Sequence, residues 1–444
     1  MPTLFKIAFR NIQRNTRRTV MTILAIAMGA VAMLVFGAFM VFIILGYRTG
    51  VVEGVGHLGV FQRGYLEVGS GNPSGYGIED YERLTKVIAD DPVLGPLVEI
   101  VTPTVTLYGL AGNAAVDSSK NFFGLGVVPA DRLKMSSWNE YHLTGGRRRE
   151  PLQLSDDDPT IGVVGVGMAR ILGLCDALRI PNCVNPPGTA QARPGDGVPE
   201  INLLAAATGG APSVVRLKVV QAQGQDIKEL DDSFVAMNLR LAQQLLFGKG
   251  ERKVTSLEIQ LHHTADIARA RARLDALYKA NGLDLETRDY QELTPQYAET
   301  IGMFMAIFIF IAAVMGLIVL FAVSNTMSMS VMERTNEIGT TRALGVRRSG
   351  VRREFLVEGS LLGVIGASAG VLAAWAVASL INASGITWTP PGDASPIPFR
   401  LLFGGSPAMI VGTWLGLVLI ATFAAFWPAA RAARMPVVDA LRHV

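Results

Sequence analysis

Charged side chains are concentrated in one short stretch that lies between two long apolar runs. The stretch "SMSVMERTNEIGTTRALGVRRSG" covers residues 328–350 and contains Glu333, Glu337 and several arginines. The two glutamates lie one helical turn apart, and Arg334 can reach Glu337 three positions later, so ion pairs can stiffen a helix here. Gly345 then permits a sharp turn. This pattern predicts an ion-paired helix followed by a turn.

The sequence lacks the motifs of several catalytic classes. No G-x-x-x-x-G-K-[ST] run is present to hold ATP phosphates, and neither H-E-x-x-H nor G-x-S-x-G occurs. The spacing of His142, His262 and His263 from the cysteines does not point to a metal site. The apolar runs contain no Asp, Glu, Lys or Arg of the kind that marks an ion-coupled carrier. We therefore expect no catalytic residue, no metal site and no cofactor in this chain.

Four long runs without charged residues predict four transmembrane helices. The 444 residues are 50% hydrophobic and only 17% charged, and the mean hydropathy is +0.35. Each run exceeds the roughly 20 residues that a helix needs to cross a bilayer. The uncharged runs lie between Arg18 and Arg48, Glu299 and Glu333, Glu358 and Asp393, and Arg400 and Arg431. From them we predict spans at 19–46, 299–327, 357–382 and 406–428, of which the second and third include the glutamate that bounds the run. The first run is longer than the apolar part of a typical signal peptide, so we expect a retained anchor.

The distribution of basic residues predicts the orientation, because loops rich in Lys and Arg stay in the cytoplasm. The segment 1–18 is basic and predicts an amphipathic helix at the cytoplasmic interface. The arginine-rich segment 328–356 and the tail 429–444 are also expected in the cytoplasm. The segment 383–405 has few charges and is expected outside. Membrane orientation explains the basic residues, so we expect no nucleic-acid partner.

The insert 47–298 between the first two spans predicts a large α+β domain outside the cytoplasm. Near its start, "YLEV" predicts a strand, "IEDYERLTKVIADD" a helix and "VEIVTPTVTLYGLA" a strand. Near its end, "TSLEIQLH", "ADIARARARLDALYKANG" and "LDLETRDY" repeat that order. Two such units can pair into one subdomain, and the middle of the insert can form a second.

Both cysteines, Cys175 and Cys183, fall in this insert. In an oxidising compartment such a pair favours a local disulfide. Two unpaired thiols remain the alternative, because sequence separation does not define the geometry that a bridge requires.

The predicted order of elements is one helix, a large outside domain and three further helices. This order resembles that of the permease subunits of the MacB, LolC/LolE and FtsX family of ABC transporters, which is also called the type VII or mechanotransmission group. That family carries a run close to E-R-x-x-E-I-G-x-x-R-A-L/V-G-A, followed by a basic helix and F-L-x-E-(A/G). The matching residues here are Glu333, Arg334, Glu337, Ile338, Gly339, Arg342, Ala343, Leu344, Gly345, Phe355, Leu356 and Glu358. Val346 stands where the family commonly has alanine, which is a conservative difference.

Both ends of the chain agree with this resemblance. The stretch "FRNIQRNTRRTVMTILAIAMG" is similar to the family's basic entry into its first helix. The stretch "PAARAARMPVVDALRH" is similar to its usual ending, P-A-x-x-A-x-x-x-x-P-x-x-A-L-R. MacB itself has a fused ATPase domain, which is absent from this sequence, so the chain is closer in this respect to the lipoprotein-releasing subunits.

The resemblance implies that residues 347–354 form a short amphipathic coupling helix, which docks in a groove of a separate ATPase subunit. ATP and Mg would then be bound by that partner, and we expect ATPase activity only in the complex. The residues expected to couple the chain to the ATPase are Glu333, Arg334, Glu337, Gly339, Arg342, Gly345, Arg347, Arg348, Arg352, Arg353 and Glu358.

The resemblance also implies a multi-pass protein of the bacterial inner membrane that pairs with a second copy or a paralogue. The expected function is extraction of a lipoprotein or another amphiphile from that membrane. One alternative is MacB-like efflux with a periplasmic adaptor and an outer-membrane channel. A second alternative is FtsX-like regulation of a cell-wall hydrolase without transport.

Overall fold

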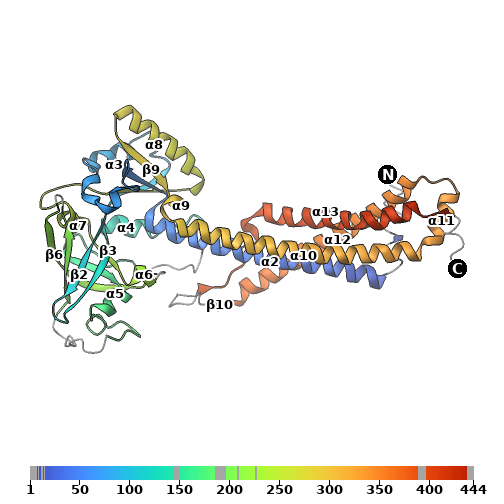
Figure 1. The fold of residues 1–444 in the computed structure, drawn as a ribbon, viewed down its shortest axis with the longest axis horizontal. Coiled ribbons are helices and arrows are strands. Elements are labelled where there is room, and N and C mark those ends of the chain that lie inside the picture. Colours follow the sequence, from blue (N-terminus) through green and yellow to red (C-terminus); the bar gives the residue numbers. More distant parts are fainter. Residues whose placement is uncertain are drawn as a thin grey trace. The chain divides into compact units, whose positions relative to one another are not determined.

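The computed structural model describes residues 8, 10–11, 14, 16–143, 151–185, 197–207, 210–225, 228–388 and 397–437. The chain divides into two compact units, and Figure 1 labels many of their elements. The helical unit comprises Met1–Leu45, Glu299–Trp388 and Pro398–Val444. The inserted unit comprises Gly46–Ala298 and Thr389–Ile397.

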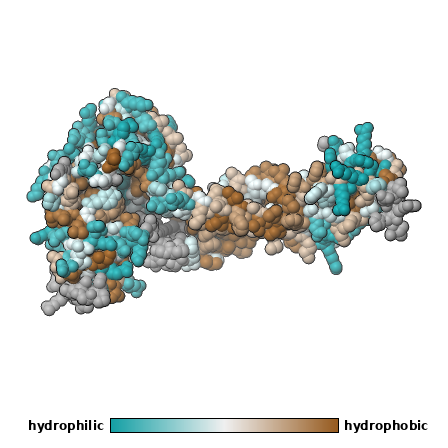
Figure 2. Space-filling view, in the orientation of Figure 1, coloured by the Kyte–Doolittle hydropathy of each residue, from teal (hydrophilic) through white to brown (hydrophobic). Residues whose placement is uncertain are grey.

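Long helices make up the helical unit. They are α2 (Thr16–Val55), α10 (Pro295–Glu333), α11 (Thr335–Ala343), α12 (Arg348–Ser384) and α13 (Pro407–Arg434), with the short elements β10 (Thr387–Trp388), β11 (Ile397–Pro398) and η4 (Phe403–Gly405). Residues 46–55 of α2, residues 295–298 of α10 and Ile397 of β11 belong to the inserted unit. Among the described residues, α2, α10, α12 and α13 are long and apolar enough to cross a membrane. Apolar side chains cover their middle parts in Figure 2, whereas the end that carries α11 is polar. The chain is therefore a membrane protein.

Helix α12 packs closely against two neighbouring helices through glycines on its surface. A Cβ atom added at Gly359 would lie 2.4 Å from the Cβ of Ala425 on α13. A Cβ added at Gly370 would lie 2.4 Å from the Cβ of Ala30 on α2. Small residues let the helix backbones approach each other in this way. The small residues of α12 thus serve packing within a single chain.

The inserted unit is built on a mixed sheet. Its strands are β1 (Leu58–Gln62), β2 (Val98–Asn113), β3 (Ser118–Val127), β4 (Ile161–Gly165), β5 (Glu200–Ala206), β6 (Pro212–Gln223), β7 (Phe234–Asn238), β8 (Ser256–Leu261) and β9 (Leu285–Asp289). Its helices are α3 (Tyr81–Ala89), α4 (Pro129–Met135), α5 (Val166–Ile171), α6 (Lys228–Asp231), α7 (Leu239–Leu246), α8 (Ile267–Asn281) and α9 (Tyr290–Leu293), with the short turns η1 (Gly69–Gly71), η2 (Pro73–Tyr76) and η3 (Thr264–Asp266).

The long strand β2 belongs to both parts of the sheet. The strand order is β3-β7-β4-β6-β5-β2-β8-β1-β9, and β3 also pairs with β2, which closes the first six strands into a ring. Residues 98–104 of β2 pair with β8, whereas residues 105–113 pair with β3. Strands from both ends of the insert, β1, β8 and β9, therefore lie next to one another. Helices α3, α7 and α8 contribute Ile88, Leu245 and Leu274 to the apolar core of the unit.

One expected strand is wrong. Tyr65–Val68 lies in a turn, and the strand of this region is β1, which precedes it. Gly64 has a φ of +82°, a conformation that glycine adopts readily, and the Tyr65 amide donates to the Gln62 carbonyl over 3.0 Å. The chain therefore turns back before the expected strand can form.

The expected coupling helix at 347–354 is not a separate element, because its residues form the first turns of α12. No proline interrupts the sequence between Arg348 and Glu358, so the helix continues into the predicted span. The expected helix at 1–18 lies mostly outside the described residues, since only positions 8, 10–11, 14 and 16–18 are described. Residues 389–396 of the expected outside loop and residues 438–444 of the tail also lie outside them.

Candidate functional site

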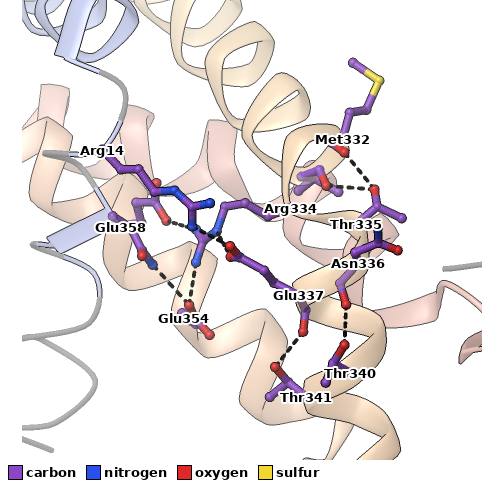
Figure 3. Close-up of polar contacts among 12 residues, drawn as sticks. Arg14, Met332, Arg334, Thr335, Asn336, Glu337, Thr340, Thr341, Glu354 and Glu358 are labelled. Carbon is purple, nitrogen blue, oxygen red and sulfur yellow. Dashed lines mark hydrogen bonds and ion pairs between the residues drawn. The ribbon is translucent and has the colours of Figure 1, made fainter. Parts of the chain in front are cut away.

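A break in the helix places Arg334 between α10 and α11. Arg334 has φ −109° and ψ 16°, so α10 ends at Glu333 and α11 begins at Thr335. The Thr335 hydroxyl lies 3.1 Å from the Val331 carbonyl and 2.9 Å from the Met332 carbonyl, and it satisfies backbone acceptors at the helix end (Figure 3). The expected charged extension of the second helix is therefore two helices with a break between them.

Arg334 bridges three carboxylates. Its Nε lies 3.3 Å from Glu337 Oε2 on α11, its Nη2 lies 3.0 Å from Glu354 Oε1, and its Nη1 lies 3.1 Å from Glu358 Oε2 on α12. Its guanidinium also lies 5.3 Å from the ring centroid of Phe355. We name Arg334, Glu337, Glu354 and Glu358 the Arg334 cluster; Figure 3 shows their side chains converging. The cluster fixes α11 against the start of α12.

The N-terminal segment contacts this region through three residues on one helical face. Asn11 donates to Glu354 over 3.2 Å, Arg14 pairs with Glu337, and Arg18 pairs with Glu333 over 2.8 Å. Positions 11, 14 and 18 follow the spacing of one helix face. The sequence predicts this segment along the membrane interface and does not predict these contacts, although the spacing of Asn11, Arg14 and Arg18 is a usable signal.

The electrostatics of Glu337 follow from its two arginine partners. The hydrogen bond from Arg14 lowers the pKa of Glu337 below its ordinary value. Partial burial opposes this effect, and the hydrogen bond from Arg334 adds to it. Glu337 is therefore held ionised at neutral pH.

Arg342 connects α11 to the end of α13. Its Nη1 donates to the carbonyls of Ala433 and Met435 over 3.0 Å each. A cation near the last carbonyls of a helix satisfies acceptors that have no helical partner and interacts favourably with the helix dipole. The expected coupling residue Arg342 therefore performs an internal structural role in this structure.

The two glycines of the expected site occupy different environments. Gly339 is buried in α11 next to Ile338. Gly345 follows α11 with a φ of +97°, and a Cβ added there would meet nothing within 4 Å. Gly345 thus provides the turn that sends the chain from α11 into α12, and Leu344 in this turn is 82% exposed.

The remaining four expected residues, Arg347, Arg348, Arg352 and Arg353, face outward, and we name them the outward arginines. All four are exposed, and none forms an ion pair with another residue of the described ranges. Arg352 lies 5.8 Å from the ring centroid of Phe426. They cluster at the N-terminal end of α12, whose first turn has no acidic residue. Positive charges are unfavourable at this end of a helix dipole, so local helix stability does not explain them.

In the inserted unit, the structure joins Cys175 and Cys183 in a disulfide with a Cα–Cα distance of 5.5 Å. Cys175 is buried, with 1% of its surface exposed. Across the described residues, no group of three or more His, Cys, Asp or Glu side chains is arranged to hold a metal ion.

Comparisons with known proteins agree with the arrangement of the helical unit. Residues 304–437 match the family model of the FtsX-like permease C-terminal domain. The match covers most of α10, from residue 304 onward, and all of α11, α12 and α13, and it includes the Arg334 cluster and the outward arginines.

Two similar proteins match nearly the whole chain, and a third matches about half of it. The macrolide export ATP-binding/permease protein MacB of Hyphomonas neptunium is 25% identical over 98% of this chain, and the match spans 60% of that protein's length. An uncharacterised ABC transporter permease of Methanocaldococcus jannaschii is 21% identical over 98% of this chain and 96% of its own length. The lipoprotein-releasing system transmembrane protein LolC of Xylella fastidiosa is 27% identical over 53% of this chain and 57% of its own.

Among solved structures, the periplasmic region of MacB from Actinobacillus actinomycetemcomitans is similar to 55% of this chain over 94% of its own length, with 13% identity and a TM-score of 0.30. Residues 304–437 therefore form an FtsX-like permease C-terminal domain, and the chain is similar in sequence to ABC transporter permeases named MacB and LolC.

Proposed function

We propose that this chain is the transmembrane subunit through which ATP hydrolysis by a separate ATPase subunit moves the inserted unit. The observation that carries this proposal is the division of the charged residues into two sets. The Arg334 cluster and Arg342 link α11 to its neighbouring helices, whereas the outward arginines are exposed at the adjacent start of α12. A partner that binds the outward arginines can therefore act on a region braced by internal ion pairs.

The partner at the outward arginines is an ATPase subunit with an acidic docking groove, which binds ATP and Mg. The relatives support this proposal, since one of them is an ATP-binding/permease protein. The chain works with a second permease copy or a paralogue in a bacterial inner membrane. Its N- and C-termini and the α11 region lie in the cytoplasm, and the inserted unit lies in the periplasm. The positive-inside distribution of Lys and Arg supports this orientation.

The proposed substrate is a lipoprotein or another amphiphile that leaves the inner membrane with the help of the inserted unit. The similarity to a lipoprotein-releasing transmembrane protein supports this choice. A second candidate is export with a periplasmic adaptor and an outer-membrane channel, which the similarity to a macrolide export protein over 98% of the chain favours.

Gentle purification of the tagged chain from native membranes, followed by mass spectrometry of bound proteins and lipids, tests the proposal. Lipoproteins or excess bound lipid together with an ATPase subunit would support extraction. An adaptor and an outer-membrane protein would favour export instead. A cell-wall hydrolase without lipid cargo would contradict both candidates and favour regulation.

A further inference from the structure

The end of α2 is bonded firmly to the sheet of the inserted unit. The carbonyl of Gly54 accepts a hydrogen bond from Arg132, which also pairs with Glu258 on β8 over 3.0 Å. The carbonyl of Val52 accepts from the fully buried Gln260, also on β8, over 3.4 Å. Arg132 supplies the partner that the Gly54 carbonyl lacks at the helix end, and Gln260 adds a second bond to the Val52 carbonyl, which also accepts from the Gly56 amide over 2.9 Å. The last turns of α2 therefore behave as part of the sheet.

The start of α10 is connected to the same sheet by an interrupted path. Strand β9 ends at Asp289, and the four-residue helix α9 ends before Thr294, which has φ −128° and ψ 77°. Helix α10 begins only at Pro295. No continuous ladder of helical hydrogen bonds crosses this joint, so it can bend at a lower cost than a helix can. Without another connection, a movement of α10 would be absorbed at the joint.

Arg48 supplies one such connection. It lies near the end of α2, and its Nε donates to the hydroxyl of Tyr297, in the first turn of α10, over 3.1 Å. Tyr297 is 3% exposed, and its ring centroid lies 5.3 Å from the rings of Tyr47 and Tyr290. Arg48 therefore links the end of α2 to the start of α10 at a cluster of aromatic rings.

A second set of hydrogen bonds fixes the Arg48 side chain in position. Its Nη1 donates to the Tyr141 hydroxyl over 3.1 Å, and that hydroxyl lies 2.9 Å from the Thr264 hydroxyl. The Thr264 hydroxyl donates to Glu140 over 2.7 Å. Each hydroxyl in this chain of bonds thus has an acceptor for its proton, and the chain ends on a carboxylate. A satisfied network of this kind holds its members in one geometry.

His57 completes the network. Its Nδ1 accepts from the Leu261 amide over 3.0 Å, so its Nε2 carries the proton and faces the Thr264 hydroxyl at 3.2 Å. The ring lies 4.9 Å from that of Trp138, and the residue is fully buried. The orientation of Tyr141 is therefore set by groups that belong to the sheet and its adjoining loop.

We propose that Arg48 is a positioning residue that locks the start of α10 to the end of α2, so that both helices move the inserted unit together. The inference rests on the proposed function, because it concerns how movement reaches that unit. While Arg48 is bonded to Tyr297, a displacement of α10 cannot be absorbed by bending of the joint around Thr294. Without this bond, α10 can shift while the sheet stays where it is.

Tyr297→Phe is the sharpest test, because it removes the hydroxyl that accepts from Arg48 and keeps the buried ring. Tyr141→Phe is the matched control, since it removes the other hydroxyl acceptor of Arg48 without touching α10. The complex is purified from native membranes, and amide hydrogen exchange is measured without nucleotide, with Mg-ATP and with a non-hydrolysable ATP analogue. The rate of ATP hydrolysis is measured in parallel.

Without nucleotide, we expect Tyr297→Phe to accelerate exchange at residues 294–301 about tenfold, which corresponds to the loss of one hydrogen bond to a charged donor. Tyr141→Phe should accelerate exchange at these residues clearly less, because the bond from Arg48 to Tyr297 itself remains. The nucleotide-dependent change at β9 and β1 should be several-fold smaller in Tyr297→Phe, while the basal rate of ATP hydrolysis stays unchanged.

Two results separate the failure of this inference from that of the proposed function. Unchanged exchange at the start of α10, or a full nucleotide response of β9 in Tyr297→Phe, would overturn the role of Arg48 alone. A wild-type complex whose inserted unit does not respond to nucleotide would overturn the proposed function, and with it any transmission through Arg48.

Discussion

Arg334 reaches Glu358 over 3.1 Å, although 24 positions separate the two residues and Glu358 has only 6% of its side chain exposed. The contact joins the break between α10 and α11 to the beginning of α12. A carboxylate this deeply buried requires a cation, because removing one partner of a buried ion pair leaves an uncompensated charge. The pair therefore fixes the geometry of the region that presents the outward arginines.

Replacing Arg334 should loosen α11. Arg334→Met leaves Glu358 and Glu354 without their shared cation, and we expect local destabilisation of about 3–5 kcal/mol. Hydrogen exchange of the α11 amides in detergent measures this loss. Arg348→Met, an exposed arginine on α12, is the control and should leave the α11 amides protected. Adding Glu358→Gln to Arg334→Met should restore part of the protection, and equal exchange in all of these variants would contradict the structural role of Arg334.

Charge reversal at two positions of α11 should separate ATP hydrolysis from movement. Glu337→Lys opposes Arg14 and Arg334, and Arg342→Glu faces the carbonyl ends of α13. Each variant should remain in the membrane, while the movement or transport obtained per ATP falls about tenfold, as expected for the loss of charged hydrogen bonds. Asp157→Lys, an exposed charge reversal in the inserted unit, is the control. Wild-type coupling in both α11 variants would refute the role of this helix.

The close packing of α12 on α2 should make Gly370 sensitive to a single methyl group. The Cβ of Gly370→Ala would lie 2.4 Å from the Cβ of Ala30 and 2.8 Å from the Ala27 carbonyl oxygen, so backbone must move. We expect a cost of about 1–3 kcal/mol, seen as a lower Tm in detergent. Gly416→Ala on α13 is the matched control, because its Cβ meets nothing within 4 Å. Equal Tm values for the two variants would show that α2 and α12 do not pack this closely.

The buried His57 predicts that stability falls in mild acid. Burial lowers the pKa of His57 to about 4, whereas its ordinary value in an unfolded chain is 6.5. The nearby Glu140 opposes this shift, and Arg48 adds to it. Stability from the neutral ring is thus fully present above pH 6.5 and is lost as the pH falls toward 4. Between pH 7.5 and 5 the loss is about 2 kcal/mol.

Thermal unfolding of the full chain in detergent at these two pH values measures the effect. The transition of the inserted unit should move to lower temperature at pH 5 in the wild-type chain and move less in His57→Gln, which has no titrating ring. Parallel shifts in the two proteins would mean that His57 is not the group responsible.

The sequence predicts the apolar helices well. Placing a charged side chain in lipid is costly, so a long run without charges marks a membrane span. It does not predict how far α2 and α10 continue beyond their apolar parts. Arg48 and Glu53 look like the start of a loop in the sequence, yet they lie within α2, which ends at Val55. The bonds that hold this end come from Arg132 and Gln260, which are distant in the chain.

The sequence also shows which charged residues make up the site. It does not show which of them form internal ion pairs and which stay exposed. Nothing in the spacing of the arginines separates Arg334, which bridges three carboxylates, from Arg348, which is exposed. The contact of Arg14 with Glu337 joins residues that are 323 positions apart. Such pairs depend on how the helices pack, and a single sequence carries no direct record of that packing.

The central claim, that the outward arginines bind an ATPase subunit, is tested most directly by co-purification with and without charge reversal at all four positions. The wild-type chain, captured with a non-hydrolysable ATP analogue and mild crosslinking, should recover an ATPase subunit in equal amount. The variant with Arg347, Arg348, Arg352 and Arg353 changed to Glu should insert in the membrane and lose that subunit. If the wild-type chain recovers no ATPase, or if the fourfold variant retains it in equal amount, the account is contradicted.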